Sequence, residues 1–286
     1  MAGCWSGSGK NIIERAMKVK SLVKEKEIAV KTALAAGVLL RRHLGKLQDK
    51  DVDIKKRFDY VTVVDKKSET LIIDLIRKAF PKHKFLAEEL HRDERGGFRW
   101  IIDPLDGTTN YIHSVPVFAI SIALEHDDEI VLGVIYDPMR KELFVAEKGR
   151  GATLNGRPIH VSPIGQAERA LLGTGFPFRS QEYLEEYLLS FRQFVAGMSG
   201  IRRIGAVALD FAWLACGRYD AFWETGLAPW DVAAGSLLIK EAGGEITDFS
   251  GGDQPIWTGN AIASNGLLHA AMLQVIKKAF GQTVPR

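Results

Sequence analysis

The sequence has little of what marks several large classes of protein. Only two of its 286 residues are cysteine, Cys4 and Cys216, so we expect no disulfide framework and predict a cytoplasmic location. No apolar run approaches the roughly 20 residues that a membrane-spanning helix needs. The 38 basic and 35 acidic residues leave a net charge of +3, which is too small to indicate nucleic-acid binding.

Several cofactor and catalytic motifs are also missing. The seven histidines are scattered without zinc-like spacing, and neither a Gly-x-Ser-x-Gly elbow nor a Walker phosphate loop occurs. The glycines at 173 and 175 lack the third glycine and the acidic partner of a dinucleotide-binding fingerprint. The sequence therefore argues against a zinc enzyme and a serine hydrolase of the α/β-hydrolase type. It also argues against a protein that binds nucleotides through a Walker loop or a dinucleotide-binding fingerprint.

The N-terminal part of the chain divides by composition. Residues 1–10 are rich in Gly and Ser and lack the apolar core of a secretory signal, so we interpret them as a flexible leader or a remnant of expression. We expect a single domain over residues 11–286. Apolar residues at spacings near three and four predict helix over residues 11–44, whereas the charge run over residues 49–57 predicts an exposed loop.

The rest of the chain alternates between strand and helix patterns. Apolar segments separated by turn residues predict consecutive antiparallel hairpins over residues 115–161. After residue 170, short strands alternate with helices. Asp65, Asp231 and Asn265 each precede a helical pattern, so each is predicted to be an N-cap.

The strongest chemical signal is the stretch Asp-Pro-Leu-Asp-Gly-Thr-Thr-Asn at residues 103–110. Its two carboxylates, Asp103 and Asp106, repel one another at this separation, and burial increases the repulsion. A hard cation such as Mg²⁺, which takes oxygen ligands, would relieve it. Spacing alone leaves a polar Asp-Gly turn as an equal alternative. The pair Glu88-Glu89 is similarly open to two interpretations, solvated surface or the edge of a sheet where ligand sites gather.

Taken together, four motifs resemble those of the inositol monophosphatase family of Mg²⁺-dependent phosphatases. They are residues 59–65 (Asp-x-Val-Thr-x-x-Asp), Glu88-Glu89, residues 103–110, and residues 230–235 followed by 241–244. The likeness runs from about residue 28 to the C-terminus, and residues 173–231 look most like the bacterial branch. Ala87 departs from the family, which usually has glycine before the glutamate pair.

The resemblance implies an α/β fold in which helices and mixed or antiparallel sheets alternate as an αβαβα sandwich. It also implies two to three Mg²⁺ ions, with Glu88, Asp103, the Leu105 carbonyl, Asp106 and Asp231 as metal ligands. Asp65 and Thr108 would orient the attacking water. Substrate contacts would come from Leu105, Asp106, Gly107, Thr108, Gly205, Ala206, Val207 and Glu224.

The activity that the resemblance implies is Mg²⁺-dependent hydrolysis of a phosphate monoester, with myo-inositol monophosphate as the first candidate. Fructose 1,6-bisphosphate and 3′-phosphoadenosine phosphate are alternative substrates, and a binding role in transcription or RNA processing is an alternative function. The basic stretches Lys18–Lys31 and Arg202-Arg203 support a nucleic-acid partner only weakly, because both are more simply solvated surface. A small phosphorylated polyol or sugar as substrate, a homodimer, and inhibition by lithium are further expectations.

Overall fold

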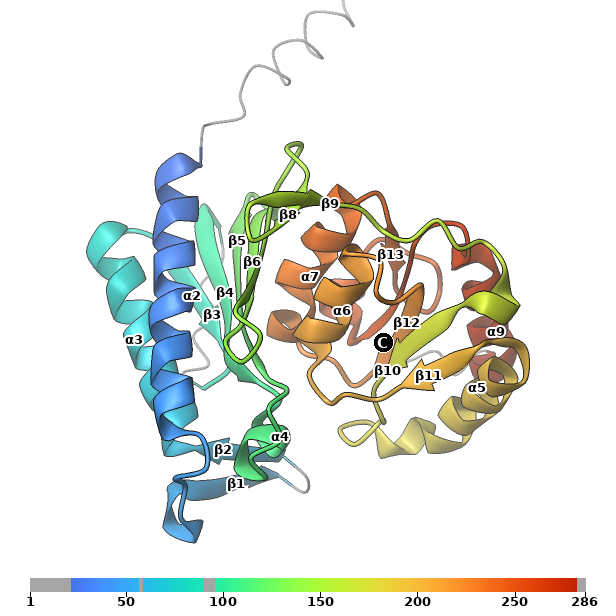
Figure 1. Ribbon diagram of the computed structural model, residues 1–286, viewed down its shortest axis with the longest axis horizontal. Coiled ribbons are helices and arrows are strands. Elements are labelled where there is room, and N and C mark those ends of the chain that lie inside the picture. Colours follow the sequence, from blue (N-terminus) through green and yellow to red (C-terminus); the bar gives the residue numbers. More distant parts are fainter. Residues whose placement is uncertain (1–21, 57–58, 90–95, 282–286) are drawn as a thin grey trace, which may run out of the picture.

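The computed structural model describes residues 22–56, 59–89 and 96–281. Figure 1 shows alternating layers, in which helices cover the outer faces of the seven-stranded and the five-stranded sheet and further helices lie between these sheets. The predicted αβαβα sandwich is therefore confirmed. Among the described residues, no helix combines the length and the apolar character that crossing a bilayer requires.

The larger sheet comes from the N-terminal half of the chain. Its strands lie in the order β3 (Lys84–Ala87), β4 (Phe98–Asp106), β5 (Ala119–His126), β6 (Glu129–Asp137), β7 (Glu142–Glu147), β8 (Ala152–Leu154) and β9 (Arg157–Ile159). The pair β3–β4 is parallel and the other neighbours are antiparallel, which confirms the predicted hairpins over residues 115–161. Helices α2 (Val23–His43) and α3 (Val63–Ala79) bury their apolar stripes against its outer face.

The smaller sheet comes from the C-terminal half. Its strands lie in the order β11 (Gly200–Arg202), β10 (Leu171–Thr174), β12 (Ala221–Thr225), β14 (Asn260–Ser264) and β13 (Glu245–Thr247). Helices α6 (Val207–Ala215) and α7 (Pro229–Glu241) lie between the two sheets, and most of their residues are buried. Helices α5 (Leu184–Gly197) and α9 (His269–Phe280) cover the outer face.

Short elements complete the fold. They are β1 (Val52–Lys56), β2 (Asp59–Thr62), α4 (Thr108–Ile112), α8 (Pro255–Thr258) and the 3₁₀ turns η1 (Asp49–Asp51), η2 (Ala167–Arg169) and η3 (Gln181–Tyr183). The loop predicted over residues 49–57 is wrong for residues 52–56, because β1 pairs with β2 as an antiparallel ribbon despite its charged residues, and residue 57 lies outside the described residues. The helix predicted over residues 11–44 is confirmed for α2, whereas residues 11–21 and the leader at 1–10 lie outside the described residues.

Helix α3 starts earlier than predicted. Thr62 is its N-cap, and the Thr62 hydroxyl accepts hydrogen bonds from the N–H groups of Val64 and Asp65. Asp65 lies three positions inside the helix, where its carboxylate accepts the Thr62 N–H at 2.9 Å. The predicted N-cap role of Asp65 is therefore wrong, and the two residues form a capping box.

The other two predicted caps are corrected in a similar way. Helix α7 begins at Pro229, so Asp231 is its third residue, and its carboxylate accepts the N–H of Ala228 at 2.8 Å. Helix α9 begins at His269, and the side chain of Asn265 accepts the N–H of the true N-cap, Leu268, at 3.2 Å. In both cases the polar side chain stabilises the turn from a position other than the cap itself.

Candidate active site

A cavity of about 140 Å³ lies where the C-terminal end of β4 meets the N-terminal ends of α6 and α7. Its walls come from both halves of the chain. All but one of the predicted site residues line it: Glu88, Asp103, Leu105, Asp106, Gly107, Thr108, Gly205, Ala206, Val207, Glu224 and Asp231. The exception is Asp65, which is fully buried behind Thr108.

The end of β4 builds one wall of the cavity. The register of pairing with β5 shifts between Asp103 and Asp106, across Pro104, which has no N–H to donate. An oxygen of Asp103 accepts the N–H of Leu105 at 3.0 Å. Gly107 then adopts a left-handed conformation with φ of 93°, and a Cβ there would lie 3.0 Å from the Val117 carbonyl oxygen. Glycine thus permits the turn that starts α4 at the cavity.

Asp106 joins the two halves of the molecule. Its carboxylate accepts the N–H groups of Val207 at 3.2 Å and Ala208 at 2.7 Å, in the first turn of α6. The N-terminus of a helix favours negative charge, so α6 stabilises this carboxylate. Asn110 supports the same junction by donating to the carbonyl oxygen of Ile204 at 2.8 Å.

Asp65 is buried and is hydrogen-bonded to Thr108, which is only half-buried. The Thr108 hydroxyl lies 3.0 Å from one oxygen of Asp65 and 3.1 Å from the carbonyl oxygen of Leu105. Burial raises the pKa of Asp65 to about 6, although hydrogen bonds from Thr62 and Thr108 oppose the rise. Asp65 therefore reaches the cavity through Thr108 and not directly.

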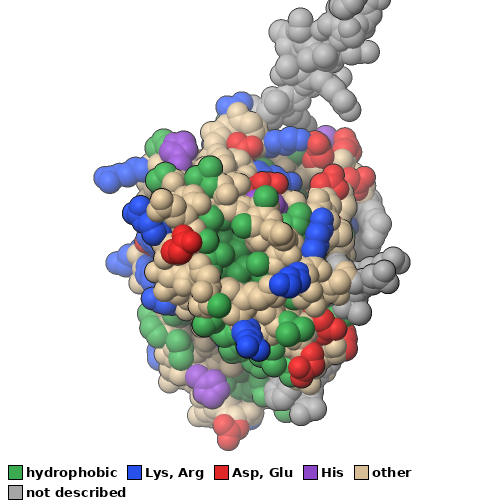
Figure 2. All heavy atoms as spheres, turned by 90° about the vertical axis from the view of Figure 1, so that its right-hand side faces the viewer, with side chains coloured by type: hydrophobic (Ala, Val, Ile, Leu, Met, Phe, Trp, Pro, Cys, Tyr) green, Lys and Arg blue, Asp and Glu red, His purple; other side chains and the backbone are tan. Residues whose placement is uncertain are grey.

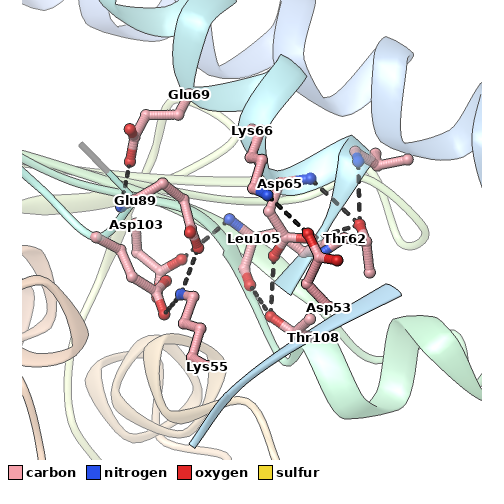
Figure 3. A network of polar contacts seen from close by, with 12 residues as sticks. Asp53, Lys55, Thr62, Asp65, Lys66, Glu69, Glu89, Asp103, Leu105 and Thr108 are labelled. Atoms are coloured by element: carbon pink, nitrogen blue, oxygen red, sulfur yellow. Dashed lines mark hydrogen bonds and ion pairs between the residues drawn. The ribbon is translucent and has the colours of Figure 1, made fainter. Parts of the chain in front are cut away.

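Two basic residues that the sequence analysis missed bind the acidic ones. Lys55 on β1 lies 3.0 Å from Glu88 and 2.5 Å from Glu89, and Figure 3 shows its ammonium group turned toward Glu89. Arg179, which also lines the cavity, lies 3.1 Å from Asp231 and 3.9 Å from Glu88.

Mutual repulsion among the acidic residues remains large. Burial raises the pKa of Asp103 well above its usual value, and the charges of Glu88, Asp106 and Asp231 raise it further. Burial also raises the pKa values of Glu88 and Asp106, and in each case the charge of Asp231 adds to the rise. The group would therefore gain from a cation that neutralised it.

The donor set fits Mg²⁺ in kind, because it offers carboxylate oxygens and the Leu105 carbonyl. As the side chains stand, however, no three Asp, Glu, His or Cys residues of the described chain are placed to hold one ion. Lys55 and Arg179 instead form ion pairs with Glu88 and Asp231. Metal binding would thus need these ion pairs to loosen.

The opposite wall is formed by residues of the C-terminal half. Gly205, Ala206 and Val207 approach the cavity at the start of α6, and Glu224 reaches it from β12. Burial raises the pKa of Glu224 to about 8. Asp210, one turn into α6, also lines this wall and was missed by the sequence analysis because it lies in an otherwise apolar helix.

Comparison with known proteins gives one consistent family. The sequence model of the inositol monophosphatase family matches residues 22–280. The chain is 47% identical to the Nus factor SuhB of Pseudomonas aeruginosa, over 87% of this chain and 94% of that protein. It is 43% identical to an inositol-1-monophosphatase of Mesorhizobium japonicum, over 88% of this chain and 95% of that protein.

Solved structures agree. The extragenic suppressor protein SuhB of Bartonella henselae superposes with a TM-score of 0.86 at 43% identity, covering 89% of this chain and 99% of that one. The Thermotoga maritima IMPase superposes with a TM-score of 0.84 at 36% identity, covering 91% and 99%. The likeness therefore spans nearly the whole described fold, including both walls of the cavity.

Proposed function

Because this chain belongs to the inositol monophosphatase family, we propose that it hydrolyses a small phosphate monoester in a Mg²⁺-dependent reaction, with myo-inositol monophosphate as the substrate. The observation that carries the proposal is the meeting of Glu88, Asp103, Asp106 and Asp231 in one cavity. A relative at 43% identity is named inositol-1-monophosphatase, which supports the choice of substrate.

The acidic residues and the Leu105 carbonyl would hold two to three Mg²⁺ ions. When bound, Mg²⁺ would lower the pKa of water and stabilise negative charge developing on the leaving oxygen. The burial of Asp103 and Asp106 supports this role, because the carboxylates are already removed from bulk water and positioned by hydrogen bonds. Binding the ions in this way would also relieve the repulsion among the carboxylates.

Thr108 and Asp65 would position the attacking water. The Thr108 hydroxyl donates to Asp65, so its remaining lone pairs can accept a hydrogen bond from water in the cavity. A carboxylate with a pKa of about 6 suits the acceptance of a proton near neutral pH. The water proton would thus be drawn toward this pair while the water oxygen attacks phosphorus.

The substrate would lie between the two walls. The phosphate would contact the backbone N–H groups of Gly107 and Thr108 where α4 begins. The alcohol would lie against Gly205, Ala206 and Val207, with Glu224 accepting one of its hydroxyl groups. A buried carboxylate in this position disfavours an apolar leaving group, because the carboxylate would be left unpaired.

Phosphate release from a panel of monoesters tests the proposal. The panel contains myo-inositol 1-phosphate, fructose 1,6-bisphosphate, 3′-phosphoadenosine phosphate and p-nitrophenyl phosphate, each assayed with Mg²⁺ and with a chelator. We expect the highest kcat/KM for the inositol ester, loss of activity on chelation, and recovery on adding Mg²⁺. Equal turnover after chelation would contradict the metal requirement, and preference for the nucleotide would replace the proposed substrate.

A role in transcription is a second candidate because the Pseudomonas aeruginosa relative is named a Nus factor. Figure 2 views the side that carries α5 and α9, where Lys and Arg side chains are spread among hydrophobic and other groups, with several along the left edge. Arg203, one of the predicted basic residues, lines the cavity and lies 5.3 Å from the ring centres of Phe176 and Phe178. Salt-dependent binding to RNA, measured by fluorescence anisotropy, would support a nucleic-acid role, and no binding at low salt would remove it.

A further inference from the structure

The two glycines at 173 and 175 make room for two carboxyl groups. Gly173 is in β10 and Gly175 follows it, so the two residues share one face of the chain. A Cβ on Gly173 would lie 3.0 Å from an oxygen of Asp210, and a Cβ on Gly175 would overlap the carboxyl group of Glu224. The two acidic side chains therefore pack directly against these glycines.

Asp210 is an unusual residue for a structural position. It is among the residues that line the cavity, yet it is only 1% exposed. Among the described residues, no hydrogen-bond partner reaches its Oδ1 atom. Burying a polar atom without a partner is destabilising, so folded proteins rarely retain one without another benefit. An unpartnered oxygen on a residue that lines a cavity is explained if a ligand supplies the missing hydrogen bond.

Charges around the two carboxyl groups favour a shared role. Burial is the main cause that raises the pKa of Asp210, the charges of Glu224 and Asp106 add to it, and the positive charge of Arg203 opposes it. Two neighbouring buried carboxyl groups do not both ionise readily. When one is neutral it donates a hydrogen bond while the other accepts, and hydroxyl groups can satisfy both.

We propose that Asp210 is a specificity-determining residue that, together with Glu224, binds two hydroxyl groups of a polyol on the leaving-group side of the cavity. The inference rests on the proposed phosphatase function and extends it, since Asp210 has no part in holding metal or activating water. It also explains why glycine occupies 175, where a larger residue would displace the Glu224 carboxyl group, whereas a Cβ at 173 would press equally on Asp210 and on the Tyr219 ring.

Steady-state kinetics of Asp210→Leu and Asp210→Asn at saturating Mg²⁺ test the inference. The substrates are myo-inositol 1-phosphate and p-nitrophenyl phosphate, whose leaving group carries no further hydroxyl. We expect Asp210→Leu to raise KM for the inositol ester about 3- to 100-fold, the range for losing a hydrogen bond to a neutral or to a charged carboxyl group, while kcat/KM for the aryl ester changes little. Asp210→Asn keeps an acceptor and a donor, so it should retain part of the preference.

A matched control and a stability measurement separate this role from a structural one. Asp248→Asn alters a buried carboxylate that accepts the N–H groups of Ser250 and Gly252 and does not line the cavity, so the substrate preference should persist. The Tm of Asp210→Leu should equal or exceed that of the wild type, because an unpartnered buried carboxyl is removed.

The outcomes distinguish this inference from the proposed function. If the wild type prefers the inositol ester and Asp210→Leu keeps that preference, the inference is overturned while the phosphatase proposal stands. A lowered Tm with equal losses on both esters would also overturn it, in favour of a structural role. If the wild type releases phosphate from neither ester with Mg²⁺, the proposed function itself fails.

Discussion

The two walls of the cavity differ in whether their buried carboxyl groups have hydrogen-bond or ion-pair partners. In the acidic wall (Glu88, Asp103, Asp106 and Asp231), every carboxylate has a partner: Lys55, Arg179 or a backbone N–H. In the alcohol wall (Gly205, Ala206, Val207, Asp210 and Glu224), an oxygen of Asp210 is buried with no partner among the described residues. The carboxylates of the acidic wall are thus already paired before any ligand arrives, whereas the alcohol wall keeps hydrogen-bonding capacity for one.

The largest expected effect comes from removing one charge of the acidic wall. Asp103→Asn keeps the oxygen that accepts the Leu105 N–H but removes a proposed metal-ligating charge, so we expect turnover to fall by about 10³-fold. The Tm in chelator should stay the same or rise, because one of several repelling charges is lost. Phosphate release and thermal unfolding measure the two effects.

The matched change on the alcohol wall sharpens the contrast. Glu224→Gln should act mainly on KM for the inositol ester, since this residue is proposed to contact the alcohol and not the metal. Wild-type turnover by Asp103→Asn at saturating Mg²⁺ would remove Asp103 from the mechanism. Equal kcat losses in the two variants would contradict the proposal that the acidic wall acts in turnover and the alcohol wall in substrate binding.

The pH dependence of stability should also reveal the buried carboxyl groups. Burial raises the pKa of Asp65 to about 6 and that of Glu224 to about 8, above the values near 4 expected in the unfolded chain. Between these limits the folded state binds more protons than the unfolded state, so stability falls as pH rises. In chelator, we therefore expect the Tm to rise as pH is lowered from 8 to 6.

Magnesium should weaken or reverse this trend, because we propose that it binds the deprotonated carboxylates of the acidic wall. The measurement is a series of thermal unfolding curves across this pH range, with chelator and with saturating Mg²⁺. A Tm in chelator that falls steadily from pH 8 to pH 6 would contradict the raised pKa values. Identical profiles with and without Mg²⁺ would contradict metal binding at the acidic wall.

The sequence predicts best what lies in one continuous stretch. Residues 103–110 carry two carboxylates, a glycine and hydroxyl groups in a few positions, and their clustering is visible without a fold. The sequence also indicates where α3 and α7 begin. Thr62 precedes Asp65 by the three positions of a capping box, and Pro229 is typical of the first residue of a helix.

What the sequence does not predict depends on contacts between distant segments. Lys55 lies in a charge run typical of a loop, and only the pairing of β1 with β2 carries it to Glu88. In the sequence, the glycines at 173 and 175 are only an incomplete dinucleotide-binding motif. The fold shows that Asp210 and Glu224 pack against them. These roles arise from steric room and charge in three dimensions, which spacing along the chain does not encode.

The smallest expected effect concerns the cation that bridges two residues of the acidic wall. Arg179 lies 3.1 Å from Asp231 and 3.9 Å from Glu88, so its guanidinium neutralises charge that Mg²⁺ would otherwise neutralise. We expect Arg179→Gln to tighten Mg²⁺ binding about two- to fivefold, the scale of a partly exposed ion pair. Calorimetric titration with Mg²⁺ alone measures this without any substrate.

Arg218→Gln is the matched control, because Arg218 has similar exposure and forms an ion pair with Glu142 away from the cavity. It should leave Mg²⁺ affinity unchanged. The Tm of Arg179→Gln in chelator should fall, since Asp231 and Glu88 lose a cation, and added Mg²⁺ should restore it. Weaker Mg²⁺ binding by Arg179→Gln would instead mean that this arginine favours Mg²⁺ binding. The acidic wall would then depend on Arg179 both with and without Mg²⁺.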